Sequence, residues 1–182
     1  MAADPTITPD DKDWTWVLDR ACPECGLDTR GVDPPKVADL IRANAAAWQT
    51  VLQRTDVAVR ARPDVWSPLE YACHVRDVFA LYDERLALML ADDRSPEEPA
   101  RFANWDQDAT AVEARYAEQD PTAVGPEITA AAEQLATRFD GVTGAQWDRT
   151  GLRSDGALFT VATFSRYLIH DPVHHLGDVG GT

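Results

Sequence analysis

The sequence predicts an all-α protein, and three observations support that fold class. Apolar residues recur at helical spacing over several long stretches, and residues that favour helix starts and stops bound these stretches. Nowhere does a run of alternating β-branched residues indicate a strand. The 182 residues suit one domain and can bury a core without a disulfide or a metal. We therefore expect about four main helices, long enough for an antiparallel bundle.

The first predicted helix follows an irregular N-terminal arm, residues 1–33, whose apolar patch contains Trp14 and Trp16. We expect these two indoles to pack onto the body of the protein. The Asp-Pro-Pro motif at 33–35 starts the helix, because aspartate caps an N-terminus and proline lacks the N–H that would have no partner in the first turn. Apolar residues then recur at helical spacing as far as Leu52.

The second helix begins with a capping box. Ser67 and Glu70 can each satisfy a free N–H at the helix start, and the proline between them fits the first turn. An apolar stripe then carries the helix to about Leu90. The stripe contains Tyr71, His74, Val75, Val78, Tyr82, Leu86 and Met89. Residues 92–99 are acidic and contain proline, so they are predicted to form a loop.

Two further helical segments follow this loop. Residues 102–108 lead into the first, with Asp108 as its cap, and this helix extends through Tyr116. The second starts at Asp120 and the proline after it, and Gly141 ends it. The two segments could also be one interrupted element.

The last predicted helix carries most of the histidines. Residues 144–158 show little periodicity and are predicted to form a long loop. Thr160 then caps a helix that ends at the glycine pair 180–181. Residues of its inward stripe recur every three or four positions, and they are Phe164, Leu168, Asp171, His175 and Val179.

The chain is strongly acidic, with 17 basic and 31 acidic residues and a formal net charge of −14. A nucleic-acid duplex or an anionic membrane surface needs a basic footprint, so neither is an expected partner. The N-terminus lacks the basic start and the apolar core of a signal peptide. The longest apolar run, Leu86–Ala91, is far too short to span a membrane. We therefore expect a cytoplasmic protein.

The four histidines are His74, His170, His174 and His175. Imidazole is a common ligand of zinc, nickel and iron, and residues four apart on a helix share a face. The last helix contains two such pairs, His170 with His174 and Asp171 with His175. The apolar stripe places the second pair on the inward face and the first pair about 100° away from it.

His74 lies in the apolar stripe of the second helix, so it can meet Asp171 and His175 inside one end of the bundle. Buried imidazoles and carboxylates are costly unless they are paired or bind a metal. Three protein ligands leave open positions on an ion, which is typical of a catalytic site. Pro172 lies inside the last helix, and a shift of register there would let His170 take the place of Asp171. Histidines at the helix surface and at the edge of the core, with no metal, are the alternative.

A CxxC motif lies in the arm, formed by Cys22 and Cys25. It has the spacing of one half of a zinc ribbon, but a structural zinc site usually has four ligands, and the sequence has no second CxxC. The third cysteine, Cys73, lies in the second helix. The pair could shape a turn, form half of a metal site that is completed elsewhere, or be redox-active. Glu24 and Asp28 work against a thiolate of low pKa.

Two motifs, taken together, resemble the DinB-like superfamily. They are Trp66-Ser-Pro-Leu-Glu-Tyr-Ala-Cys-His74-Val-Arg-Asp77 and Tyr167-Leu-Ile-His170-Asp-Pro-Val-His174-His175-Leu-Gly-Asp178-Val. The likeness covers residues 34–180 and points to the actinobacterial branch related to mycothiol-dependent maleylpyruvate isomerase. It implies an up-down-down-up four-helix bundle as a domain over residues 34–182, preceded by the arm with its CxxC motif at 1–33.

The resemblance also implies a divalent metal, zinc or nickel. Carried over to this sequence, its ligands are His74 from the second helix and Asp171 and His175 from the last. Many relatives have histidine at the position of Asp171, and the isomerases have glutamate. His170 therefore remains the alternative to Asp171. The family also leads us to expect a homodimer.

For function, we expect an enzyme whose metal activates a low-molecular-weight thiol such as mycothiol for thiol transfer or isomerisation. Its partners would be that thiol, as cosubstrate, and a small-molecule substrate. Arg149 and Arg153 precede the last helix and could hold a substrate carboxylate. The alternatives are a non-catalytic, stress-related metal-binding bundle and a metal-dependent hydrolase. An open ion beside a cleft lined by tryptophan or arginine would favour an enzyme, whereas a fourth protein ligand would favour a structural site.

Overall fold

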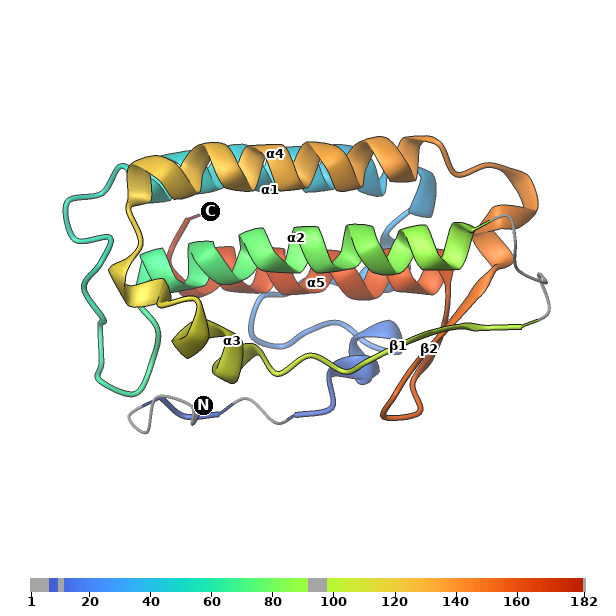
Figure 1. Cartoon of the computed structure of the whole chain (residues 1–182), viewed down its shortest axis with the longest axis horizontal. Coiled ribbons are helices and arrows are strands. Elements are labelled where there is room, and N and C mark those ends of the chain that lie inside the picture. Colours follow the sequence, from blue (N-terminus) through green and yellow to red (C-terminus); the bar gives the residue numbers. More distant parts are fainter. Residues whose placement is uncertain (1–6, 10–11, 92–97, 182) are drawn as a thin grey trace.

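The computed structural model describes residues 7–9, 12–91 and 98–181 (Figure 1). The predictions for Met1–Pro5 and for residues 92–97 of the acidic loop lie outside the described residues. In the described part of the chain, four long helices form the body: α1 (Val37–Leu52), α2 (Pro68–Leu90), α4 (Pro121–Asp140) and α5 (Val161–Asp178).

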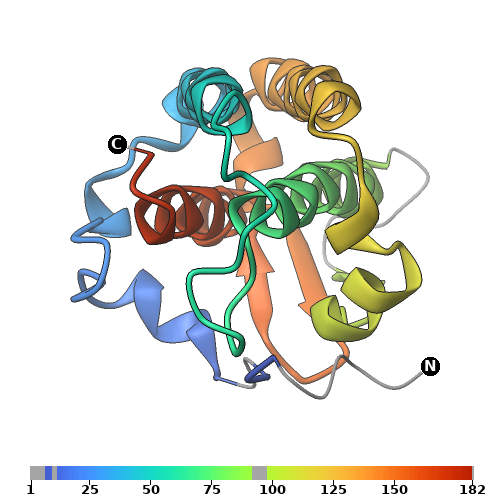
Figure 2. The same cartoon turned by 90° about the vertical axis from the view of Figure 1, so that its left-hand side faces the viewer.

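The four long helices form a bundle with up-down-down-up topology. In Figure 1, α1 and α5 run in one direction, and α2 and α4 run in the opposite one. Seen from the end, in Figure 2, α1 and α4 form one layer over α5 and α2. Both α4 and α5 pack against α1 and against α2. The predicted fold class and topology are therefore confirmed.

Each long helix contributes large buried side chains to one core. Trp48 of α1, Phe79 of α2, Leu135 of α4 and Leu168 of α5 are all fully buried. Burying a side chain of this size contributes about 1.5–3 kcal/mol relative to leaving it exposed. Packing between the helices therefore stabilises the fold and holds α2 against α5.

Three helix starts are confirmed. Ser67 accepts a bond from the N–H of Glu70, whose carboxylate accepts one from the N–H of Ser67 at 2.8 Å, so the predicted capping box is present. Thr160 caps α5 through a similar pair of bonds. Asp120 caps α4 by accepting a bond at 2.8 Å from a backbone N–H of the first turn. These local signals fix where three of the long helices begin.

Two other predicted caps are wrong. Asp33 makes no side-chain cap bond, because residues 34–36 form a 3-10 turn and α1 begins only at Val37. Two consecutive prolines account for this, since the second disfavours α-helical backbone at the first. The short helix α3 (Gln107–Glu113) is capped by Asp106, and Asp108 lies within its first turn. A 3-10 turn separates α3 from α4, so they are two elements.

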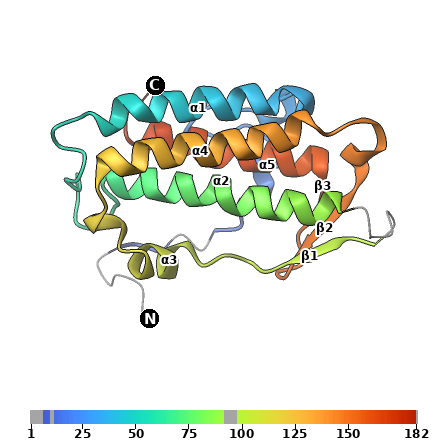
Figure 3. The same cartoon turned by 45° about the horizontal axis from the view of Figure 1, so that its top comes forward.

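The predicted long loop at 144–158 is also wrong, because it contains a strand. β2 (Thr150–Arg153) pairs in parallel with β1 (Ala100–Phe102) and antiparallel with β3 (Leu158–Thr160), in the order β1-β2-β3. Strands of three or four residues are too short for alternation to be visible, and β1 is far from β2 in the sequence. Figure 3 shows the connection that carries β1 and α3 running alongside α2.

The described part of the N-terminal arm covers the side of α5 that faces away from α1 and α4 (Figure 2). The ring centroid of Trp14 lies 5.3 Å from that of His170 and 5.2 Å from that of His174. Trp16 lies 6.4 Å from His170, so both indoles pack onto the body as predicted. The helices that the structure describes include none with the length and apolar character that crossing a membrane requires.

Candidate metal centre

α2 and α5 bring His74, Asp171 and His175 together. Nε2 of His74 lies 3.2 Å from Oδ1 of Asp171, and Nε2 of His175 lies 3.9 Å from the same oxygen. The ring centroids of the two histidines are 4.9 Å apart. One donor atom from each residue lies within 4.8 Å of the other two. The three residues therefore converge as expected, but the expected burial is wrong: Asp171 and His175 are half-buried, whereas His170 and His174, placed on the neighbouring face, are buried.

The donor set fits a divalent cation. Zinc and related ions accept imidazole nitrogen and carboxylate oxygen at about 2.0–2.2 Å, so donors 3.2 and 3.9 Å apart can reach one ion. Burial raises the pKa of Asp171, but the neighbouring His74, together with His175 and His170, outweighs burial and lowers that pKa to about 2. The carboxylate is therefore ionised at neutral pH and ready to bind a cation.

Aromatic rings hold the imidazole of His74 in place. Trp105 stacks on it, with ring centroids 5.2 Å apart and an interplanar angle of 11°, and Trp66 packs at 5.3 Å. His74 is fully buried, so its ring has little room to rotate. Trp105 precedes α3, so the connection between β1 and α3 forms part of the site.

Asp178 orients the other imidazole. Its Oδ2 lies 2.9 Å from Nδ1 of His175, whereas Nε2 of the same ring faces Asp171. Histidines that bind a metal usually donate their other N–H to a carboxylate in this way, which fixes the tautomer. Burial raises the pKa of Asp178, but the hydrogen bond with His175 and the charges of His175 and His174 together outweigh burial and lower that pKa. Asp178 is thus an ionised acceptor.

The substitution Asp178→Asn is expected to weaken zinc binding by His74, Asp171 and His175 by about 10- to 100-fold, because the ring of His175 loses the carboxylate that orients it. Competition with a chromophoric chelator measures the affinity. Asp148→Asn is the matched control, since it removes the same charge at an exposed position outside the site. Equal zinc affinities for the two variants would show that Asp178 has no orienting role.

His74, Asp171 and His175 lie beside a cleft of about 620 Å³. Asp171 and His175 line the cleft, together with side chains from α2, the connection before α3, the N-terminal arm and β2. The lining includes tryptophan and arginine side chains. We call His74, Asp171 and His175 the cleft triad. Three candidate ligands beside a cleft lined by tryptophan and arginine are features that, on the criterion given above, would favour an enzyme.

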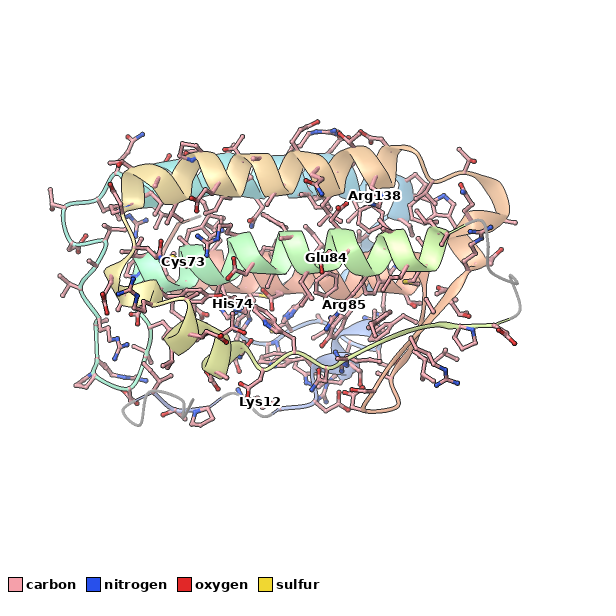
Figure 4. The ribbon with its side chains drawn as sticks, viewed as in Figure 1. Lys12, Cys73, His74, Glu84, Arg85 and Arg138 are labelled. Atoms are coloured by element: carbon pink, nitrogen blue, oxygen red, sulfur yellow. The ribbon has the colours of Figure 1, made fainter. Side chains whose placement is uncertain are left out.

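Arg85 lies on the side of α2 that carries His74 and faces the N-terminal arm, where Lys12 is labelled (Figure 4). It lines the cleft, although only 4% of the residue is exposed. Its Nη2 donates to the carbonyl of Ala103 at 2.8 Å, and burial lowers its pKa. Within the described residues, no carboxylate forms an ion pair with Arg85. Arg85 was not among the candidates drawn from the sequence. A charged residue next to the apolar stripe of α2 could have indicated it.

The two arginines singled out from the sequence have different surroundings. Arg153 lines the cleft, where its Nη1 donates to Oη of Tyr167 at 3.0 Å and its Nε donates to Asp155 at 2.9 Å. Arg149 lies outside the lining and donates to the carbonyl oxygens of Leu90 and the residue after it. Of this pair, only Arg153 is positioned to meet a ligand in the cleft.

His170 and His174 belong to a second cluster, which also contains Cys22 and Cys25. One donor atom from each of these four residues lies within 4.8 Å of the others. α5 continues through its internal proline without a break, and Asp171, rather than His170, faces His74. Sequence reasoning considered the CxxC motif as half of a metal site but did not connect it with the HxxxH motif.

The cysteine thiols lack the surroundings of a reactive nucleophile. Burial raises the pKa of Cys25, and it raises that of Cys73 to about 12. Cys73 belongs to neither cluster, and its Sγ lies 4.0 Å from the carbonyl oxygen of Tyr116. A redox-active pair needs a thiolate of low pKa, so these surroundings argue against that interpretation of the CxxC motif.

Comparisons with known proteins agree with this architecture. A family model described as DinB superfamily matches residues 42–179. Among solved structures, YfiT from Bacillus subtilis superposes with a TM-score of 0.65 at 14% sequence identity, over 79% of this chain and 82% of that chain. YfiT is described as a probable metal-dependent hydrolase with an unusual four-helix bundle topology. A comparison with curated proteins gives no match.

Proposed function

Because the chain belongs to the DinB superfamily, we propose that it is a metal-dependent enzyme using zinc or nickel. In its cleft, a low-molecular-weight thiol such as mycothiol meets an anionic small molecule, and the reaction is thiol transfer or thiol-assisted isomerisation. The observation that carries the proposal is the cleft triad, a set of three donors beside a cleft of about 620 Å³. Three protein ligands leave a position for a substrate, whereas a fourth would close the site.

A zinc or nickel ion held by the cleft triad would act as a Lewis acid that lowers the pKa of a thiol, or of water, in the remaining position. The residues around the triad keep its geometry fixed. Trp105 restrains the ring of His74, and Asp178 restrains the ring of His175. A site organised before the substrate arrives does not have to reorganise during the reaction.

One buried cation in the cleft supports an anionic substrate. The lining contains five aspartates besides Lys12, Arg85 and Arg153, and Arg153 already pairs with Asp155. Arg85 is buried and lacks an acidic partner among the described residues, and a buried charge without a partner is costly. A substrate carboxylate would supply that partner through two parallel N–H···O bonds.

Cobalt substitution tests thiol binding. In the parent protein loaded with Co(II), the cleft triad offers no sulfur ligand, so added mycothiol would give a thiolate-to-cobalt charge-transfer band beyond any already present. We expect this increase to appear during a mycothiol titration and to be missing in His74→Ala. A spectrum that stays unchanged at millimolar mycothiol would contradict the thiol proposal.

Hydrolysis is the second candidate, favoured by the description of YfiT as a probable metal-dependent hydrolase. The position that would take a thiol can also take water. The two candidates differ in what they require: hydrolysis of a carboxylate-bearing nitrophenyl ester by the zinc protein needs no thiol. Turnover of that ester, together with no new cobalt–thiolate band when mycothiol is added, would select hydrolysis.

A further inference from the structure

We propose that Cys22, Cys25, His170 and His174 form a second metal site, a structural zinc site that fastens the N-terminal arm to α5. Below, these four residues are called the arm site. The arm site is separate from the proposed function, since it shares no ligand with the cleft triad. Either proposal can therefore fail without the other.

The donor chemistry of the arm site is that of structural zinc. Each of the four residues offers one sulfur or nitrogen donor within 4.8 Å of the others, and Sγ of Cys22 lies 3.7 Å from Nδ1 of His174. Two thiolates and two imidazoles in a tetrahedral arrangement are a common zinc ligand set, and sulfur ligands disfavour magnesium and calcium. Four protein ligands complete a tetrahedron, so the arm site is closed whereas the cleft triad is open.

Local backbone structure presents both cysteines to α5. The turn between them is closed by two backbone bonds, from the N–H of Gly26 to the carbonyl of Cys22 at 2.8 Å and from the N–H of Cys22 to the carbonyl of Leu27 at 2.9 Å. Gly26 has a φ of +76°, a conformation that residues with side chains rarely adopt. The ligands His170 and His174 are four residues apart and so share one face of α5.

A buried polar atom in the arm site lacks a partner. His170 is 4% exposed, and its Nε2 has no hydrogen-bond partner in the described part of the chain. Leaving a buried polar group without a hydrogen bond destabilises the fold. A bound cation would remove this destabilisation, because the imidazole of His170 would then coordinate the metal.

The surroundings of His174 have the arrangement found around metal-bound histidines. Nδ1 of its ring faces Cys22, and Nε2 lies 3.4 Å from a carboxylate oxygen of Glu24 and 3.8 Å from one of Asp178. A ligating histidine usually directs its second nitrogen at a carboxylate, which fixes the tautomer that binds the metal. Glu24 lies between the two cysteines. The CxxC turn therefore supplies two ligands and also a carboxylate that orients the ring of His174.

Closing the arm site would also complete the cleft. Trp14, Lys12 and Asp13 of the arm line the cleft, and the ring of Trp14 packs on both histidines of the arm site. The zinc would therefore hold this part of the cleft wall against α5. It would act on the reaction through position alone, since its own ligand positions are all taken by the protein.

Metal counting on the purified full chain tests the arm site. We expect the Cys22→Ser/Cys25→Ser variant to hold about one ion per chain fewer than the parent protein, whether or not the cleft triad holds an ion. With Co(II) in place of zinc, the parent should show a thiolate-to-cobalt charge-transfer band that this variant lacks. Cys73→Ala is the matched control: it removes a buried thiol outside both sites and should keep the band.

Measurements on the parent protein test the arm site without relying on correct folding of the variant. Blocking the thiols of the parent with an organomercurial should release one zinc per chain, detected with a chromophoric chelator, and His74→Ala should leave this release unchanged. If the parent gives no cobalt–thiolate band and releases no zinc on thiol blocking, the arm site does not bind zinc. Recovery of a Cys22–Cys25 disulfide from protein purified under reducing conditions would also overturn the proposal.

Discussion

Replacing His74 by alanine is expected to empty the cleft triad of metal and to lower thiol-dependent activity about a thousandfold or more, which corresponds to the several kcal/mol that a Lewis acid contributes. The ring is fully buried, and its Nε2 lies 3.2 Å from Asp171. Only two donors of the cleft triad then remain, and two ligands hold an ion weakly. Elemental analysis and the mycothiol titration of the cobalt protein measure the two effects.

Folding of this variant needs its own control, because alanine leaves a cavity where the imidazole packs between Trp66 and Trp105. The arm site supplies that control within the same molecule. Its four ligands are untouched, so its cobalt–thiolate band should persist in His74→Ala. A variant with the parent's metal content and the parent's response to mycothiol would refute the role assigned to His74.

Removing the arm site is expected to release the N-terminal arm while the bundle stays folded. The bundle has its own core of fully buried side chains, whereas the described arm contains only short 3-10 helices. Structural zinc contributes about 10–16 kcal/mol in small domains, and even about 3 kcal/mol of lost stabilisation would raise local opening about a hundredfold. We therefore expect trypsin to cut Cys22→Ser/Cys25→Ser about a hundredfold faster after Arg20 and Arg30.

Mass spectrometry of the fragments locates the cuts, and far-ultraviolet circular dichroism reports on the helices. Cys73→Ala is again the matched control, and its arm should be cut at the rate of the parent. A chelator added to the parent should reproduce the fast cutting, and added zinc should restore protection. Equal cutting rates for the double variant and the parent would mean that the arm needs no metal to stay in place.

The bundle could be predicted because its signals are local. The capping box of Ser67 and Glu70 and the cap at Thr160 depend on residues three positions apart, so short windows of sequence contain them. The strands could not be predicted in the same way. β2 has four residues, and its parallel partner β1 lies on the other side of two helices in the sequence. The helix start at Asp33 was predicted wrongly because each of the two consecutive prolines, taken alone, is a helix-start signal.

The cleft triad could be anticipated because all three residues lie in the apolar stripes of two helices. The stripe in α2 contains His74, the stripe in α5 contains Asp171 and His175, and these two helices pack against each other, so the three side chains meet. Arg85 was not anticipated, because its burial depends on Ala103 and on the connection before α3. The CxxC motif was considered as half of a metal site only as one of three interpretations, because its cysteines and the HxxxH histidines are separated by almost the whole bundle.

The two ligand pairs of α5 are offset by a single position: His170 and His174 belong to the arm site, and Asp171 and His175 to the cleft triad. One position corresponds to about 100° around the helix axis. An insertion or deletion of one residue early in α5 would therefore turn both pairs away from their partners in the same event. For both proposed sites to work, the number of residues in this part of α5 therefore has to stay the same, whereas residues outside the two pairs can be exchanged.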